Sequence, residues 1–341
     1  MTRLYTNAVM QQHLTGRHPE CPARLDAIDQ RLKRGLPAGV VRQTSWSPVD
    51  PSQLQRIHPS SYQQQVQTLC EAGGGALDPD TIVSQRSHEI ACLAAGAVVD
   101  AVDHVLDGHD TSALCLVRPP GHHALAERAM GFCLFNNVAV AAINALQEKE
   151  LNRLLIIDWD VHHGNGTQDL FWTSPQVGFY SVHRWPFYPG SGDDHETGSG
   201  DGLGTTCNLP LPMGISRQQY LEQFERTLVE FAARINPELI LISAGFDSHY
   251  LDPVGSLGLE SSDFGELTRI VQQIACSYCD NKIVSVLEGG YHLEALAESV
   301  EVHLQQLASP NADSGQQQTH RLPENNQVQG PDRTKDQDGP K

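Results

Sequence analysis

The sequence is short of basic residues. It carries 23 Lys and Arg against 41 Asp and Glu, a formal net charge of −18 over 341 residues. The basic residues are scattered, so no local patch offsets the acidic balance. Nucleic acids and anionic membranes repel such a surface, so we expect neither as a partner. An acidic balance instead suits a neutral or cationic substrate.

Long apolar runs and a leader segment are also missing. No stretch approaches the length of a membrane-spanning helix, and the first residues, MTRLYTNAVMQQHLTG, lack a basic segment followed by an apolar one. The eight cysteines are spread along the chain, and the C-x-x-C pair at 276–279 has no second pair to complete a structural zinc site. These absences predict a cytoplasmic protein with reduced thiols. The sequence is compatible with a homo-oligomer but does not determine the oligomeric state.

Three common motifs are absent as well. The chain has no G-x-S-x-G nucleophile motif, no P-loop and no G-x-G-x-x-G between a strand and a helix. The glycine-rich segment 190–204 fits no phosphate-binding pattern, so we expect it to be a loop. Serine-hydrolase, P-loop NTPase and dinucleotide-binding functions are therefore not indicated.

Short apolar segments alternate with longer amphipathic ones in residues 1–308, which we take as one catalytic domain. The apolar segments predict strands at 112–120, 153–160, 177–183, 238–246 and 282–290. The amphipathic segments predict helices at 87–108, 137–150, 216–235 and 261–279, with Ser216 and Ser262 as N-caps. This alternation predicts an α/β fold, a single domain with a mostly parallel sheet and helices on both faces. Residues 309–341 are polar and almost free of large apolar side chains, and predict a disordered tail.

Titratable residues follow all five predicted strands. The residues that do so are His122 and His123, Asp158 to His163, His183, Asp247 and Tyr291. Ligands of open α/β sheets bind outside the carboxyl ends of the strands. The sequence therefore predicts one site at this edge of the sheet.

The segment IIDWDVHHGNG, residues 156–166, suggests a metal site. If the strand stays extended to His162, Asp158, Asp160 and His162 point to one side, while Trp159 and Val161 point to the other. With Asp247 as a third ligand, Asp160 and His162 match the three-ligand pattern of a catalytic zinc site. The alternative is that Asp160 and His162 only cap the following helix.

Several nearby residues are candidates for proton transfer and substrate binding. If Asp160, His162 and Asp247 bind the metal, His122 and His123 are available as proton-transfer groups. We expect a polar partner to orient each of them, and the candidates are Asp158 and Asn165. Tyr291, on a Gly-Gly turn, would donate a hydrogen bond to an oxyanion, although an aromatic side chain packed on the sheet edge is the alternative. We expect Phe132 and Tyr188 to wall a narrow slot or to be ordinary loop residues, and His163, His183 and Asp252 to be supporting or core residues.

The chain resembles the zinc-dependent histone deacetylase family, and within it the class II-like bacterial amidohydrolases. Family motifs follow one another over about residues 15–305, namely HPECPARL (18–25), RPPGHHA (118–124), GFCLFNN (131–137), DWDVHHGNGTQDLF (158–171), SVH (181–183), SAGFDSHYLDP (243–253) and LEGGYHLEALAES (287–299). The resemblance implies an arginase/deacetylase-like fold and a hydrolase that acts on linear amide bonds.

The resemblance also implies a role for individual residues. Zinc would be held by Asp160, His162 and Asp247, with His123 as general base and acid, His122 as its partner and Tyr291 as the group that polarises the carbonyl. For substrate binding it implies the tunnel residues Gly131, Phe132 and Tyr188, together with Val254, Gly289 and a rim aspartate, Asp80. It implies one potassium ion bound by Asp158, Asp160, His162, Ser181 and the main chain of Val182, and a second bound by Phe171, Ser174 and Val177.

Two positions depart from patterns found in parts of that family. Asn165 stands where some members have Asp, which gives His123 an amide partner and predicts a less basic imidazole. Val254 stands where polyamine-selective relatives have Glu, which argues against a cationic polyamine. We therefore predict removal of acetyl or a related acyl group from a lysine side chain of a protein or peptide. The alternatives are an acetylpolyamine or other small-amide deacetylase, a dinuclear manganese ureohydrolase and a non-catalytic reader of acyl-lysine.

Overall fold

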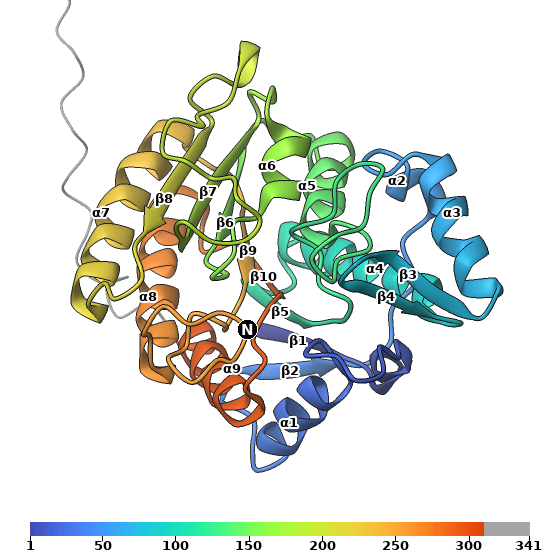
Figure 1. Ribbon diagram of the computed structural model, residues 1–341. Helices are drawn as coiled ribbons and strands as arrows, with labels where there is room; N and C mark the ends of the chain where they lie inside the picture. Colours follow the sequence, from blue (N-terminus) through green and yellow to red (C-terminus); the bar gives the residue numbers. More distant parts are fainter. Residues whose placement is uncertain (310–341) are drawn as a thin grey trace, which may run out of the picture. The chain divides into compact units, whose positions relative to one another are not determined.

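Eight strands form one parallel sheet (Figure 1) in the computed structural model, which describes residues 1–309. Across the sheet their order is β2 (Val40–Gln43), β1 (Thr2–Thr6), β5 (Ser112–Leu116), β10 (Ile283–Leu287), β9 (Ile240–Ala244), β6 (Leu154–Asp158), β7 (Val177–Arg184) and β8 (Thr206–Leu211). A small antiparallel pair, β3 (Gly74–Asp78) and β4 (Thr81–Ser84), lies apart from it. The predicted α/β class with a mostly parallel sheet is confirmed, whereas the predicted tail lies outside the described residues except for Ser309.

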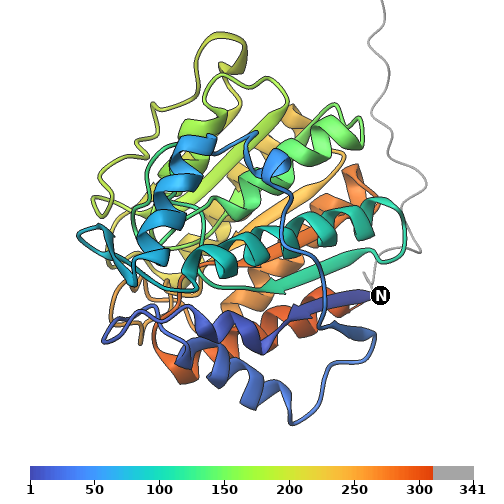
Figure 2. The same cartoon turned by 90° about the vertical axis from the view of Figure 1, so that its right-hand side faces the viewer.

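Helices cover both faces of the sheet. One face carries α1 (Ala23–Leu32), α7 (Arg217–Ile235), α8 (Ser261–Tyr278) and α9 (Leu293–Ala308). The other, toward which Figure 2 looks, carries α4 (Ser87–Leu106) and α5 (Asn137–Glu148), with α3 (Ser60–Glu71) beside α4. The short elements are η1 (Ala8–Gln12), α2 (Pro51–Leu54), α6 (Asn165–Phe171) and η2 (Gly200–Gly202). Among the described residues, no helix has the length and apolar character needed to cross a bilayer.

Burial explains why these segments fold as they do. Every residue of β5, β6, β9 and β10 is buried, because helices cover both faces of the parallel sheet. Ser216 is the N-cap of α7 in a capping box with Gln219, as predicted. The predicted cap of α8 at Ser262 is wrong: Glu260 is the N-cap, because the Asp263 carboxylate reaches back to accept its backbone N–H.

The carboxyl ends of the central strands meet where the reactive residues were predicted. Strands β5, β10, β9 and β6 are immediate neighbours, and β7 follows β6. The strand predicted at 153–160 ends earlier, at Asp158, so the condition that it stays extended to His162 is not met. There the Asp158 carboxylate accepts the backbone N–H of Asp160 at 3.1 Å in place of a ladder bond, and the chain turns. Trp159 and Val161 are fully buried, on the core side as predicted.

Candidate active site

Asp160, His162 and Asp247 form one buried group at the end of the sheet. One ligand atom of each residue lies within 4.8 Å of the others. His162 Nδ1 is 3.0 Å from Asp160 Oδ1 and 3.2 Å from Asp247 Oδ2. Two of the residues come from the loop after β6 and the third from the loop after β9, so adjacent strands bring the group together.

This group fits a cation. Asp247 Oδ1 accepts the backbone N–H of Val161 at 2.9 Å, whereas Asp247 Oδ2 is buried and has no hydrogen-bond partner in the part of the chain that the structure describes. Burial and the charge of Asp160 raise the pKa of Asp247 to about 7. An open carboxylate oxygen beside a second carboxylate and an imidazole is the donor set that zinc accepts. The capping alternative is not seen, because α6 begins with Gly164 as N-cap and no side-chain cap bond.

The backbone of Gly289 closes this group from the side of β10. Its N–H donates to Asp160 Oδ2 at 2.9 Å. A Cβ atom at this position would lie 2.2 Å from Asp247 Oδ2 and 2.5 Å from Asp160 Oδ2. Only glycine allows the main chain to approach the two carboxylates so closely.

His122 and His123 lie beside this group with different partners. Their ring centroids are 3.9 Å apart, and both side chains are buried. His122 Nδ1 is 2.9 Å from Asp158 Oδ2, and His123 Nδ1 is 2.7 Å from Asn165 Oδ1. The structure therefore forms both of the predicted partnerships.

The surroundings of the two histidines shift their pKa values in opposite directions. Burial alone would lower the pKa of His122, but the carboxylates of Asp158 and Asp160 outweigh it and raise the pKa to about 10. Burial and the positive charges of His122 and His162 hold the pKa of His123 well below its usual range. The neutral His123 donates its Nδ1 proton to the Asn165 oxygen, which leaves Nε2 as a proton acceptor. The pair thus combines a cation with a neutral base.

Tyr291 is held by three contacts. Its backbone N–H donates to Asp252 Oδ2 at 2.6 Å, and the guanidinium carbon of Arg24 lies 4.9 Å from the centroid of its ring. Arg24 Nε also donates to the carbonyl of Gly290 at 2.7 Å. Burial, together with the charges of Asp247 and Asp160, raises the pKa of Tyr291 far above its usual value. The phenol therefore keeps its proton and can donate it in a hydrogen bond.

Aromatic side chains line the approach to these groups. Phe132 lies edge-on to Tyr291 with centroids 5.8 Å apart, and Tyr188 lies edge-on to His123 at 5.2 Å. Gly131 touches His123 so closely that a Cβ atom would lie 2.3 Å from its ring. The sequence analysis missed Phe187, whose ring stacks on His162 at 5.1 Å. Its position directly before Tyr188 was the available signal.

The predicted rim residues stabilise loops around this approach. Asp80 Oδ1 accepts the backbone N–H of Gly131 at 3.2 Å. The half-buried Val254 donates its N–H to Asp252 Oδ1 at 2.9 Å. Both positions therefore lie in segments hydrogen-bonded to the site.

The residues predicted to bind potassium fall into two places. Asp158 pairs with Ser181 across β6 and β7, next to Val182 on β7. Phe171 ends α6, and its carbonyl accepts the N–H of Ser174 just before β7 begins at Val177.

His163 and His183 do not join the site. His163 contacts Ser191 Oγ at 2.9 Å and Gln168 Oε1 at 3.0 Å, and burial lowers its pKa to about 3. His183 contacts the carbonyl of Gly192 at 2.9 Å, and burial lowers its pKa to about 4. Both are neutral residues that hold the loop bearing Tyr188, in agreement with the supporting role expected of them.

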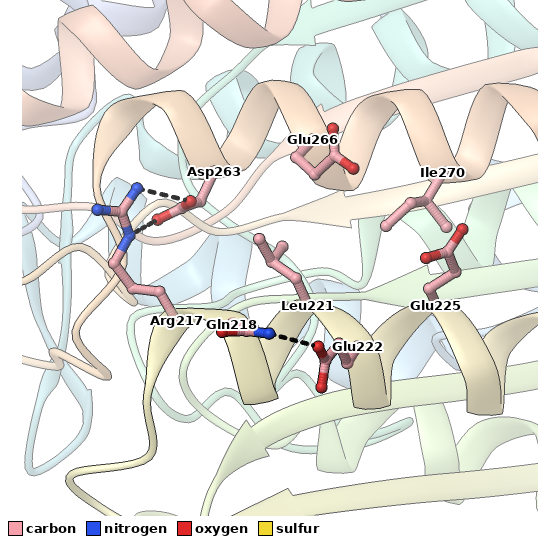
Figure 3. Close-up of a pocket in the computed structure, with 8 residues that line it drawn as sticks. All are labelled: Arg217, Gln218, Leu221, Glu222, Glu225, Asp263, Glu266 and Ile270. Atoms are coloured by element: carbon pink, nitrogen blue, oxygen red, sulfur yellow. Dashed lines mark hydrogen bonds and ion pairs between the residues drawn. The ribbon is translucent and has the colours of Figure 1, made fainter.

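A surface groove lies elsewhere, between α7 and α8 (Figure 3). It encloses about 460 Å³ and is lined mainly by charged residues, among them Glu222, Glu225 and Glu266. None of the predicted site residues lines it. This groove is therefore separate from the predicted site.

The fold and these groups define an amide-hydrolysing enzyme of the deacetylase class, and comparison with known proteins agrees. Residues 18–307 match the model of the histone deacetylase domain, and the chain belongs to the histone deacetylase family. This membership decides against the ureohydrolase and non-catalytic reader alternatives.

Individual relatives and solved structures give the same result. The chain is 42% identical over 307 residues to the human protein named polyamine deacetylase HDAC10, with 85% of this chain and 45% of that protein covered. It is 38% identical over 245 residues to a histone deacetylase-like amidohydrolase of Pseudomonas aeruginosa, with 72% and 64% covered. The crystal structure of the HDA15 HD domain superimposes with a TM-score of 0.84 at 33% identity, covering 90% of this chain and 89% of that one.

Proposed function

We propose that this enzyme is a zinc-dependent deacetylase that removes acetyl, or a related acyl group, from the side chain of lysine in a protein or peptide. One observation carries the proposal. The buried group of Asp160, His162 and Asp247 lies beside a neutral histidine, a cationic histidine and a protonated phenol. Amide hydrolysis by activated water needs a Lewis acid, a base and an oxyanion donor, and these residues can supply or hold each of them.

Asp160, His162 and Asp247 would hold the zinc ion. When bound, zinc polarises the amide carbonyl and lowers the pKa of the attacking water. His123 Nε2 accepts the proton of that water, because Nδ1 already donates to Asn165. Tyr291 donates a hydrogen bond to the oxyanion as it develops, and His123 then returns the proton to the departing lysine amine, which leaves acetate as the second product.

His122 contributes a fixed positive charge to this sequence of steps. Asp158 Oδ2 accepts a hydrogen bond from its Nδ1, and the raised pKa keeps the ring protonated at neutral pH. That charge stabilises the oxyanion and keeps His123 neutral until the water gives up its proton. Phe132 and Tyr188 would wall the approach of the apolar lysine stem.

Two potassium ions complete the proposal. Ser181 pairs with Asp158 in the sheet, which supports an oxygen-lined site formed by Asp158, Asp160, His162, Ser181 and the carbonyl of Val182. The turn between α6 and β7 supports a second one at Phe171, Ser174 and Val177. The first ion would screen repulsion between the buried carboxylates below the zinc site.

The second candidate substrate is an acetylated polyamine. The human relative, 42% identical, is named a polyamine deacetylase, which supports this candidate. Val254 argues against it, because a neutral side chain gives no charge partner for a polyamine amine.

A direct comparison of substrates tests the proposal. We expect the purified enzyme, with one zinc ion per chain by metal analysis, to hydrolyse an acetyl-lysine peptide at least about tenfold more efficiently than acetylspermidine, one charge contact being worth roughly that factor. Dialysis against a chelator should abolish hydrolysis, and added zinc should restore it. His162→Ala should bind no zinc and remain inactive after zinc is added.

Each other outcome has a defined meaning. Faster hydrolysis of acetylspermidine would favour the polyamine candidate. Full zinc occupancy with no hydrolysis of either substrate would contradict the proposed function.

A further inference from the structure

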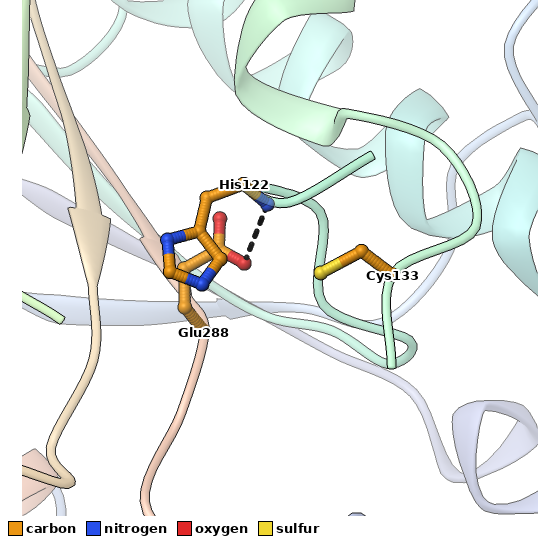
Figure 4. Close-up of side chains that lie close together, drawn as sticks. All are labelled: His122, Cys133 and Glu288. Atoms are coloured by element: carbon orange, nitrogen blue, oxygen red, sulfur yellow. Dashed lines mark hydrogen bonds between the residues drawn. The ribbon is translucent and has the colours of Figure 1, made fainter. Parts of the chain in front are cut away.

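Glu288 is a buried acid beside the catalytic histidines to which the mechanism gives no role (Figure 4). It is the first residue after β10 and is fully buried. Its Oε2 accepts the backbone N–H of Gly121 at 2.6 Å and that of His122 at 3.2 Å. Its Oε1 accepts the hydroxyl of Ser243, on β9, at 3.2 Å.

Glu288, His122 and Cys133 resemble a second metal site, since their ligand atoms lie within 4.8 Å of one another. The donors are already in use, however. His122 Nδ1 is bonded to Asp158, and both carboxylate oxygens of Glu288 accept hydrogen bonds. Burial raises the pKa of the Cys133 thiol far above its usual value, and the thiol donates to the carbonyl of Gly131 at 3.3 Å. The contacts therefore favour a structural link over metal binding.

The main chain of Glu288 is fixed as firmly as its side chain. Its N–H donates to the carbonyl of Ala244 at 3.0 Å, and its carbonyl accepts from Arg24 Nη2 at 2.5 Å. Three residues later the same segment presents Tyr291. One residue thus contacts the histidine loop through its carboxylate and leads into the tyrosine loop through its backbone.

We propose that Glu288 is a positioning residue that fixes the His122–His123 loop relative to Tyr291. The inference rests on the proposed function of these three residues. The carboxylate accepts hydrogen bonds from two successive buried N–H groups. Without it these groups would be unsatisfied, and the loop would favour another conformation. A small displacement of His123 from the attacking water is enough to slow the reaction.

Three substitutions separate positioning from a role of the negative charge. Glu288→Gln removes the charge but keeps an oxygen for the two N–H groups and an amide that can donate to Ser243. Glu288→Asp keeps the charge but withdraws it by one methylene group. Glu288→Leu keeps the approximate size and removes both acceptors.

The proposal predicts the order of kcat. We expect a decrease of less than about threefold for Glu288→Gln, about tenfold for Glu288→Asp and about 100-fold for Glu288→Leu, with KM within about twofold and zinc content unchanged, because misplacement acts on the chemical step. If the kcat of Glu288→Asp equals or exceeds that of Glu288→Gln, the negative charge matters more than the position of the acceptors, and the proposal is overturned. If Glu288→Leu does not fold, the relative kcat values of Glu288→Gln and Glu288→Asp still test the proposal.

The chain offers a control with the same bonding pattern, but greater exposure, at the opposite end of the sheet. Glu238 Oε2 accepts the backbone N–H groups of Asn152 at 2.6 Å and Arg153 at 3.0 Å, before β6 begins. Glu238→Leu removes the same kind of link far from the histidines and should leave kcat within about twofold of the wild type. An equal loss of kcat in both leucine variants would contradict a specific role for Glu288.

Hydrogen exchange gives a readout independent of activity. By mass spectrometry, a peptide covering residues 118–125 should exchange faster in Glu288→Leu than in the wild type, and at the wild-type rate in Glu288→Gln. Unchanged exchange in Glu288→Leu would overturn the proposal. If the wild type hydrolyses neither substrate, the proposed function fails while this measurement still tests the link.

Discussion

Two acidic regions of this molecule contain similar carboxylates that differ in burial and in their partners. At the edge of the sheet, Asp160 and Asp247 are almost completely buried and face one another across His162. In the groove between α7 and α8 (Figure 3), Glu222 and Glu225 are exposed, and Glu266 pairs with Arg269 on the same helix. The buried group, unlike the groove, contains a buried carboxylate oxygen, Asp247 Oδ2, that has no hydrogen-bond partner in the part of the chain that the structure describes.

The pKa values of the carboxylates also differ between the two regions. Burial and a neighbouring carboxylate raise the pKa of Asp247 to about 7, whereas a hydrogen bond from Arg269 lowers the pKa of Glu266. In the groove, water and arginine already stabilise each charge. In the site, burial and the charge of Asp160 outweigh the stabilisation of Asp247 by the nearby His162, which favours a bound cation. A count of acids therefore does not identify a site, whereas carboxylates buried side by side indicate one.

The largest effect is expected at Tyr291. Tyr291→Phe keeps the ring that contacts Phe132 and Arg24 but removes the hydroxyl. Turnover of an acetyl-lysine peptide should decrease by about 10²–10³-fold, the usual loss for one oxyanion donor, with zinc content unchanged. Unchanged turnover would remove Tyr291 from the mechanism.

Glu20 provides an intermediate case, because it is as buried as the site carboxylates but has cationic partners. It contacts Arg118, Arg24 and His13. Burial alone would raise its pKa, but these partners, Arg118 foremost, lower it to about 2. Since the folded-state pKa lies below the value of about 4.5 in the unfolded chain, this stabilisation is full above pH 4.5 and is lost as the pH falls toward 2.

The substitution Glu20→Gln should expose this dependence. At pH 7 we expect it to lower the free energy of unfolding by about 3 kcal/mol, because Arg118 loses its charge partner. The difference between wild type and variant should shrink as the pH is lowered from 5 to 3, measured by urea denaturation at each pH. A difference that stays constant with pH would mean that the ion pair is not its source.

The smallest effect is expected in the groove. Glu222→Gln combined with Glu225→Gln should change the free energy of unfolding by less than about 0.5 kcal/mol and kcat/KM by less than about twofold, as exposed positions do. Thermal denaturation and the peptide assay measure both. A large loss of activity would give the groove a function that its exposed, hydrated charges do not suggest.

The five strands predicted from apolar runs are the five contiguous central strands, from β5 to β7. The three strands of this sheet that were missed are β2 and β8 at its edges and β1 next to β2, and all three are only partly buried; the separate pair β3 and β4 was missed as well. The sequences of β1, β2 and β8 are TRLYT, VVRQ and TCNLPL, which mix polar and apolar residues, because strands at the margin of a sheet are less covered than central ones. Apolar periodicity therefore finds the centre of a parallel sheet better than its margins.

The sequence by itself determined which residues end the central strands, and hence that Asp158, Asp160, His162 and Asp247 meet at one edge. That followed from local chemistry, since apolar segments form buried strands and parallel strands share a carboxyl end. Only the tertiary structure decided that Glu288 is bonded to the His122 loop and leads into the Tyr291 loop, that Phe187 stacks on His162, and that of two adjacent histidines one is cationic and the other neutral. Those properties depend on burial and on partners distant in sequence, such as Asp158 for His122, and no local pattern encodes them.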